Sequence, residues 1–219
     1  MMDVKPNSSQ NKFRLRRINQ LKQLIEKTKL EKDQCSVLDV GGTHRFWHAW
    51  GDHIDWSGTT ITCINLNPSH AAKVKDERIR VVQGNACHLV NVKDHEYDVV
   101  FSNSVIEHVG SWLQMEVMAK EVKRVGRRYL VQTPNFWFPI EPHARTPLLH
   151  WLPEPIAYRI VMSRNCGFWK RQHTVSGAVQ TVQSAHLLDF KQMQTLFEDA
   201  VVMREKFFGM TKALIAIKE

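Results

Sequence analysis

The sequence predicts an α/β domain with a seven-stranded, mostly parallel sheet and helices on both faces. Two observations support this fold class. After residue 34, short runs rich in β-branched residues alternate with helical stretches, and strands joined by helical crossovers form parallel sheets. The chain has 219 residues, enough to bury a substantial apolar core in one domain. We therefore treat residues 35–219 as one domain.

Each element is predicted from the spacing of its apolar residues. Strands are expected in seven short apolar or alternating runs, at 36–40, 60–65, 79–83, 98–102, 128–132, 200–205 and 212–218. Helices are expected where apolar residues recur every three or four positions, at 44–50, 68–75, 110–125, 154–163 and 188–198.

The N-terminal segment carries most of the positive charge. Residues 1–32 contain nine Lys or Arg and three Asp or Glu, which is 9 − 3 = +6 of the formal +8. Residues 1–10 have no apolar period and predict a loose start. Residues 11–34 have one apolar face, including Phe13 and Leu21, and predict a basic amphipathic helix. We favour a helix that covers the binding cleft over one that binds phosphates of nucleic acid or lipid.

An aromatic insertion is predicted after the fifth strand, at about 133–185. It is rich in Trp, Phe, Pro, His and Arg, and Glu141 and Glu154 are its only acids. Loops of this length in compact domains are usually functional. Its aromatic runs are interpreted as a lid over an apolar ligand, as a foot at a membrane interface through 136–171, or as a satellite hydrophobic cluster. Its cations would suit an anionic ligand or lipid.

Composition limits the cellular setting. The four cysteines are scattered, without metal-ligand spacing, and are interpreted as reduced thiols. No apolar run approaches the roughly 20 residues of a membrane-spanning helix. We expect a cytoplasmic protein, with peripheral membrane contact as a further option.

Glycine or polar residues follow each of the first four predicted strands. Gly41 and Gly42 follow the first, Asn65 the second, Asn85 the third and Asn103 the fourth. In open parallel sheets, ligands bind beyond the carboxyl ends of the strands. Glycines there let the backbone approach a ligand closely. The four ends together predict a ligand site.

The runs VLDVGG at 37–42, GNA at 84–86 and DVVFSNSVIEHV at 98–109 resemble those of class I S-adenosylmethionine-dependent methyltransferases. The type 11 small-molecule branch is the most similar. The resemblance covers residues 35–132 and the C-terminal strand pair, and implies a Rossmann-like fold with S-adenosylmethionine as cofactor. It also implies contacts with the cofactor. Asp39, Gly41 and Gly42 would lie at the methionine end and Asn103 beside the sulfonium. The ribose and adenine would contact Asn65, Leu66, Asn85 and Ala86.

The sequence departs from this family's pattern in three places. The glycine loop is short, because Gly42 is followed by Thr43. Asn65 replaces the acid that usually accepts both ribose hydroxyls, and its amide has one acceptor oxygen instead of two. Asn85 also stands where Asp is common. A dinucleotide dehydrogenase is disfavoured, since no further glycine occurs before Gly51.

Two histidines are the candidate catalytic residues. Methyl transfer from a sulfonium needs alignment, desolvation and removal of a proton from the acceptor. His108 follows the fourth strand and is a candidate base, with a structural role at the next helix as the alternative. His143 is a second candidate. His44 and His48, beside two tryptophans, are interpreted as packing residues.

No metal is predicted. Some relatives hold magnesium with an ExxEH segment, but Ser104 replaces the first Glu here. Only Glu107 and His108 remain, and two ligands make a poor site for a hard cation.

The predicted function is methyl transfer to oxygen or nitrogen of a small-molecule, glycan or lipid-linked acceptor. Two alternatives remain open. One is an RNA methyltransferase, although nucleic acid is not the favoured partner. The other is a non-catalytic binding module that kept the fold and lost the cofactor.

Overall fold

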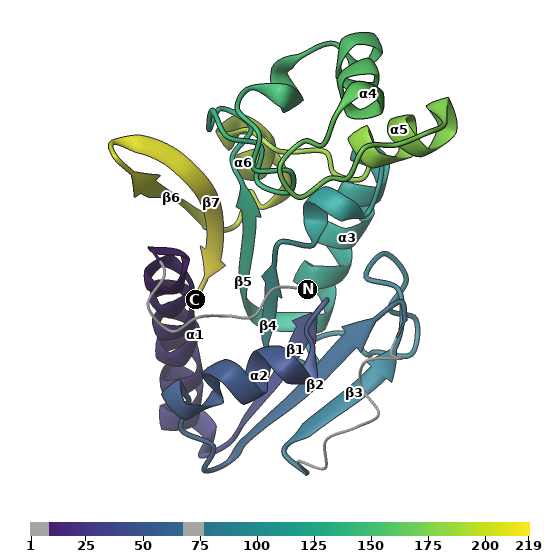
Figure 1. Cartoon of the computed structure of the whole chain (residues 1–219). Helices are drawn as coiled ribbons and strands as arrows, with labels where there is room; N and C mark the ends of the chain where they lie inside the picture. Colours follow the sequence, from purple (N-terminus) through teal and green to yellow (C-terminus); the bar gives the residue numbers. More distant parts are fainter. Residues whose placement is uncertain (1–8, 68–76) are drawn as a thin grey trace.

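The computed structural model describes residues 9–67 and 77–219 (Figure 1). The predicted helix at 68–75 lies outside these residues. One seven-stranded sheet has the order β3-β2-β1-β4-β5-β7-β6. Its first five strands are parallel, and β7 is antiparallel to both β5 and β6. The strands are β1 Cys35–Val40, β2 Thr59–Asn65, β3 Ile79–Gln83, β4 Tyr97–Asn103, β5 Gly126–Pro134, β6 Val201–Phe207 and β7 Met210–Lys218. The predicted fold class is therefore confirmed.

The helices follow the predicted order with three differences. Residues 9 and 10, expected in a loose start, already belong to α1. The predicted helix at 110–125 begins at Trp112, after its cap Ser111. A helix within the insertion, α5, was not predicted. The helices and 3-10 turns are α1 Ser9–Lys32, α2 His44–Trp50, η1 Gly51–His53, η3 Ile106–His108, α3 Trp112–Val125, η4 Leu149–Trp151, α4 Glu154–Ser163, α5 Val175–Val182 and α6 Phe190–Leu196.

Alternation along the strands gives each face of the sheet its own core. Val37 and Val99 pack with α1 and α2, whereas their neighbours Leu38 and Val100 pack with α3 and α6. Successive side chains of a strand point to opposite faces, so continuously apolar strands bury both. This two-sided burial fixes the register, and therefore the positions of the strand ends.

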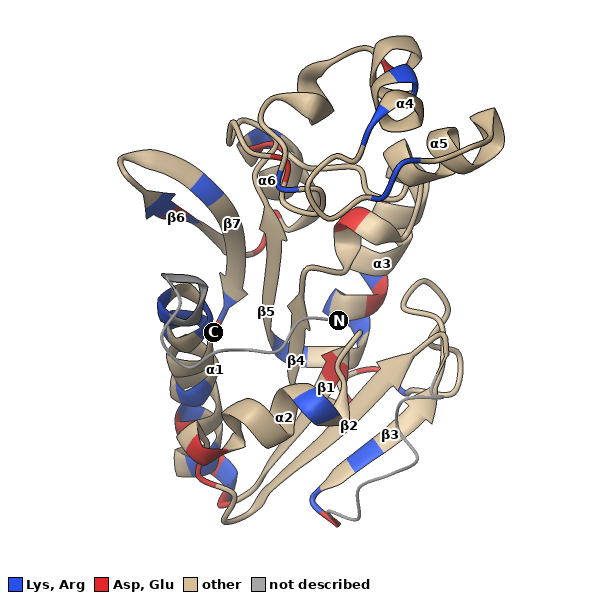
Figure 2. Ribbon diagram, in the orientation of Figure 1, with Lys and Arg blue, Asp and Glu red and all other residues tan. Residues whose placement is uncertain are grey.

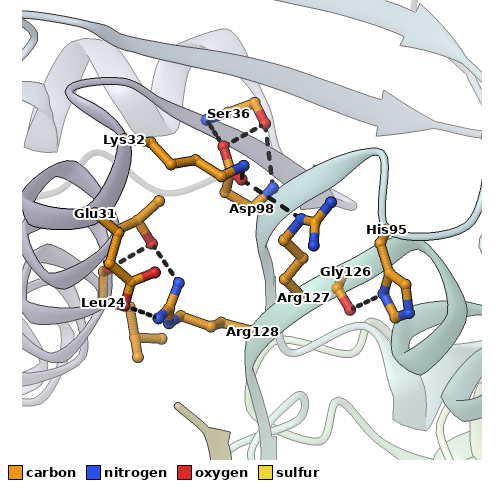
Figure 3. A network of polar contacts seen from close by, with 10 residues as sticks. Leu24, Glu31, Lys32, Ser36, His95, Asp98, Gly126, Arg127 and Arg128 are labelled. Carbon is orange, nitrogen blue, oxygen red and sulfur yellow. Dashed lines mark hydrogen bonds and ion pairs between the residues drawn. The ribbon is translucent and has the colours of Figure 1, made fainter.

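Helix α1 packs along one face of the sheet, and its cations pair with acids elsewhere in the chain (Figure 2). Lys29 pairs with Asp55, and Lys27 Nζ lies 2.8 Å from Glu219 Oε2. Figure 3 shows its C-terminal turns, where Lys32 pairs with Asp98. Much of its positive charge is therefore neutralised within the molecule.

The insertion lies beyond the ends of β4 and β5 (Figure 1). It has a small core of its own, formed by Ala144, Leu149, Ala157, Val161, Cys166 and Ala178. Some aromatic side chains remain outside this core: Trp137 is 63% exposed and Trp151 is 39% exposed. Among residues 9–67 and 77–219, no helix combines the length and apolar character needed to cross a membrane.

Candidate active site

The loop after β1 needs both of its glycines. Gly41 has φ +78°, and a Cβ there would lie 2.4 Å from Val105 Cγ2. A Cβ at Gly42 would lie 1.9 Å from Asp39 Oδ2. Helix α2 begins at His44, directly after its cap Thr43, whose hydroxyl accepts from Phe46 N at 3.2 Å. The loop is thus as short as the sequence predicts.

Asp39 lies beneath this loop. Its side chain is buried, and Trp47 Nε1 donates to Oδ2 at 2.7 Å. Burial raises the pKa of Asp39 to about 8, although the indole hydrogen bond opposes the shift. Asp39 therefore supports the loop from below.

Asn65, at the end of β2, holds the same loop from the side. Its Nδ2 donates to the carbonyl of Gly42. A carboxylate has no hydrogen to donate, so the partner explains an amide at this position. The end of β3 is linked to the same place, because Gly84 N donates to Asn65 O at 2.9 Å.

The other predicted cofactor residues lie around this frame. Leu66 is 69% exposed, which leaves an apolar side chain open to a ligand. Asn85 Oδ1 accepts from Cys87 N at 2.9 Å and so shapes its own turn. Ala86 is partly buried and packs against the core.

His44 adds a feature that the packing interpretation did not anticipate. It is buried at the start of α2, beside the glycine loop, and neither ring nitrogen has a partner among the described residues. Buried polar groups without partners are rare in native proteins. A glycine cradle, an exposed leucine and an orphaned imidazole together fit a polar cofactor with an apolar ring.

Arg17 of α1 joins three strand ends. Its Nη1 donates to Asn103 Oδ1 and to Gln132 Oε1, each at 2.7 Å. Its Nε and Nη2 donate to the two carboxylate oxygens of Glu205 at 3.1 and 3.0 Å. Arg17 was not singled out from the sequence. A signal was present, since Arg17 lies midway between Phe13 and Leu21 at a spacing of four residues.

The two candidate catalytic histidines lie together. Their ring centroids are 4.6 Å apart, in an edge-to-face arrangement. His108 Nδ1 lies 2.7 Å from the carbonyl of Ser184, and His143 Nδ1 lies 2.8 Å from Glu141 Oε1. Both partners are acceptors, so each Nδ1 carries the hydrogen and each Nε2 is left to accept a proton.

Glu141 is a functional candidate that the sequence did not single out. It is buried, and besides His143 it accepts from Ala144 N. Burial lowers the pKa of His143, but the hydrogen bond and charge of Glu141, with the charge of Glu107, outweigh burial and raise it. The only sequence signal for this pair was the position of Glu141, two residues before His143.

Glu107 completes the group. It is fully buried, and Thr133 Oγ1 donates to its Oε2 at 3.0 Å, while Oε1 has no partner among the residues described. Burial raises its pKa. The ligand atoms of Glu107, His108 and His143 all lie within 4.8 Å of one another, so the fold brings a third candidate metal ligand, His143, to the two that the sequence singled out.

A cavity of about 360 Å³ lies between the insertion, α3 and the segment before α6. Its lining is mostly apolar and includes Trp112, Met115, Phe136 and Leu149. Glu141 forms part of the wall, so the cavity adjoins the histidine pair. Its size is at the lower end of the range for small-molecule sites.

Comparisons with known proteins agree with this arrangement. Residues 38–129 match a family model described as a methyltransferase domain. No curated protein shows significant sequence similarity to the chain.

Solved methyltransferase structures share the fold. A putative methyltransferase of antibiotic biosynthesis from Anabaena variabilis is 16% identical with a TM-score of 0.53, covering 88% of this chain and 64% of its own. An S-adenosylmethionine-dependent methyltransferase from Methanosarcina mazei is 15% identical with a TM-score of 0.53, covering 85% and 92%. Phosphoethanolamine N-methyltransferase 2 from Haemonchus contortus, in complex with S-adenosyl-L-methionine, is 14% identical with a TM-score of 0.52, covering 78% and 35%.

At these identities the structural matches establish the fold alone. The chain spans just under two thirds of the A. variabilis protein and about a third of the H. contortus enzyme. The methyltransferase-domain model covers residues 38–129, which is less than half of the chain. The chain therefore has the fold of class I methyltransferases, and its residues 38–129 are similar to a methyltransferase domain.

Proposed function

We propose that this protein transfers a methyl group to an oxygen or nitrogen atom of a small-molecule acceptor, with His108 as the base that takes the acceptor's proton. Glycans and lipid-linked molecules are included among the acceptors. The observation that carries the proposal is the histidine pair beyond the end of β4, where His108 Nε2 is left as an acceptor beside His143.

The cofactor residues proposed from the resemblance remain those of the strand ends. Gly41 and Gly42 would approach the methionine end, with Asp39 supporting them, and Asn103 would lie beside the sulfonium. The ribose and adenine would contact Asn65, Leu66, Asn85 and Ala86. Bound S-adenosylmethionine supplies an electrophilic methyl group.

His143 is proposed to place a positively charged ring beside His108. Its link to Glu141 fixes the tautomer and favours a protonated ring, in the way carboxylates orient catalytic imidazoles. The carbonyl of Ser184 holds the hydrogen of His108 on Nδ1, which leaves Nε2 facing outward as an acceptor. His108 is then available to accept a proton when the acceptor is attacked.

The test uses methyl-labelled S-adenosylmethionine and a panel of acceptor classes. His108→Ala should lower turnover by about 100-fold and leave cofactor affinity nearly unchanged. His53→Ala, at an exposed histidine on η1, is the matched control and should keep normal turnover. Normal turnover in His108→Ala would remove His108 from the mechanism.

The alternative of a non-catalytic module is tested by calorimetry with the wild-type chain. We expect saturable binding of S-adenosylmethionine. Absence of binding at millimolar cofactor would overturn the enzyme proposal.

A further inference from the structure

The cavity beside the histidine pair has aromatic rings in its wall. Trp112 comes from the start of α3, Phe136 from the segment after β5, and Trp169 from the segment between α4 and α5. Figure 1 shows the insertion next to α3, beyond the ends of β4 and β5. Rings contributed by three separate segments offer stacking and edge-to-face contacts to another ring. The wall therefore fits an aromatic ligand better than a sugar or a flexible chain.

The volume of the cavity suits a ligand of one or two rings. An apolar cavity of roughly 150 Å³ holds one benzene molecule. The volume here is about 360 Å³. Buried Met115 and Leu149 add apolar surface to the lining. Two fused rings with a small substituent would therefore fill the space.

The charged residues of the lining are acids. Glu141 and Glu154 belong to it, and among the described residues that form it there is no Lys or Arg. Both carboxylates are engaged, since Glu141 Oε1 lies 2.8 Å from His143 Nδ1 and Gln183 Nε2 donates to Glu154 Oε2 at 2.7 Å. A carboxylate or phosphate group of a ligand would meet like charge here, which is costly. The lining thus favours an uncharged ligand.

His150 gives the lining an acceptor atom that has no partner. Its Nε2 lies 2.8 Å from the carbonyl oxygen of Phe136, to which Trp151 Nε1 also donates at 2.8 Å. A carbonyl only accepts, so the hydrogen of His150 lies on Nε2 and its Nδ1 keeps a lone pair. Among residues 9–67 and 77–219, this Nδ1 is buried without a hydrogen-bond partner. Such atoms are rare in native proteins, and a hydroxyl or N–H of a ligand would satisfy it.

The cavity wall is bonded directly to the candidate catalytic groups. Ser184, whose carbonyl lies 2.7 Å from His108 Nδ1, is flanked on both sides by residues of the lining. Glu141 of the lining holds His143 on the other side of the pair. A ligand in this cavity therefore lies next to His108.

We propose that the cavity binds an uncharged aromatic group of the acceptor, that a hydroxyl or N–H on this group donates to His150 Nδ1, and that the methylated atom faces His108. This inference rests on the proposed function and names the class of its acceptor. Trp112 and His150 are then specificity-determining residues, the first for the ring and the second for its polar substituent.

Equilibrium dialysis with 2-naphthol, without cofactor, tests the aromatic site. The residues proposed to hold the cofactor lie outside the lining, so binding should not need it. The wild-type chain should bind 2-naphthol saturably, and at least tenfold more tightly than either its saturated counterpart decahydro-2-naphthol or the anion 2-naphthoate. Trp112→Ala should weaken binding of 2-naphthol about tenfold. Trp137→Ala, at an exposed tryptophan outside the lining, is the control and should bind normally.

The role of His150 is tested with 2-methylnaphthalene, in which a methyl group replaces the hydroxyl. The wild-type chain should prefer 2-naphthol about tenfold, the value of one hydrogen bond. His150→Gln keeps a donor for the Phe136 carbonyl but has no acceptor at the position of Nδ1, so the preference should disappear. His173→Gln, at an exposed histidine of the same insertion, is the control and should keep it.

The outcomes separate this inference from the proposed function. Absence of saturable 2-naphthol binding, equal affinity in Trp112→Ala, or an unchanged preference in His150→Gln would overturn the inference. Binding that depends on Trp112 and His150, without methyl transfer to any acceptor of the panel, would preserve the aromatic site and reject the proposed function. Methyl transfer by a chain that binds 2-naphthol no better than decahydro-2-naphthol would do the reverse.

Discussion

At the scale of single residues, Asn65 shows why an apparent departure from a family pattern fits its surroundings. The amide donates to the Gly42 carbonyl. Asn65→Asp would replace that donor with a second acceptor, leaving the carbonyl unsatisfied and facing negative charge. We expect the free energy of unfolding to fall by about 1–3 kcal/mol, measured by urea denaturation. Asn91→Asp, at an exposed residue, should change little. An unchanged stability in Asn65→Asp would mean that the amide is turned the other way.

Asp39 predicts a dependence of stability on pH. Its pKa is raised by burial to about 8, above the value of about 3.9 expected when the chain is unfolded. The folded state therefore keeps the proton longer, so the Asp39 contribution is fully present below about pH 4 and is lost as pH rises through 8. Stability in urea should fall with pH between 5 and 8, by up to about 1.4 kcal/mol per unit.

Asp39→Asn should flatten this slope, because an amide does not ionise. Asp55→Asn is the control, since Asp55 is an exposed acid whose pKa is lowered by its hydrogen bonds to Lys29 and Ser57 and titrates below this window. The same slope in Asp39→Asn as in the wild type would contradict the assignment.

The expectation of no metal remains a prediction at the same scale. The candidate ligands Glu107, His108 and His143 lie within 4.8 Å of one another, but one carboxylate and two imidazoles are a poor set for a hard cation such as magnesium. Methyl transfer should therefore be unchanged after dialysis against EDTA, assayed with labelled cofactor. Loss of activity on chelation, restored by a divalent ion, would show that these side chains close around a metal.

At the scale of elements, Arg17 connects α1 to the ends of β4, β5 and β6. Arg17→Met would leave Glu205, which is 2% exposed, as a buried charge without its partner. We expect a loss of about 3–5 kcal/mol in stability, partly recovered by adding Glu205→Gln. Arg16→Met, on the exposed side of the same helix, should stay within about 0.5 kcal/mol of wild type. A small effect at Arg17 would mean that α1 is held by its apolar face alone.

Elements were predictable where their period was strong. The strands β1 and β4 have apolar centres, at 37–38 and 99–101, and parallel pairing then places Gly41 and Asn103 at one edge of the sheet. Contacts between distant segments were not predictable. His143 meets His108 because the insertion folds back over β4, and Ser184 reaches His108 from the far end of that insertion. Helix α5 was missed because its apolar face packs only within the insertion.

The whole molecule bears on whether nucleic acid is a partner. The +6 of residues 1–32 left a phosphate-binding helix as the less favoured alternative, and Arg17, Lys27, Lys29 and Lys32 pair with acids of the domain. Paired cations release few counterions from RNA, because their charge is already balanced. The positive charge of α1 therefore serves largely to hold this helix against the sheet.

This predicts weak RNA binding with little salt dependence. The logarithm of the binding constant for a labelled single-stranded RNA, followed by fluorescence anisotropy between 50 and 200 mM salt, should fall with a slope shallower than about −2. At about −0.7 per phosphate, that corresponds to fewer than about three contacts. A slope near −5 or steeper would require a continuous basic face and would favour an RNA acceptor over a small molecule.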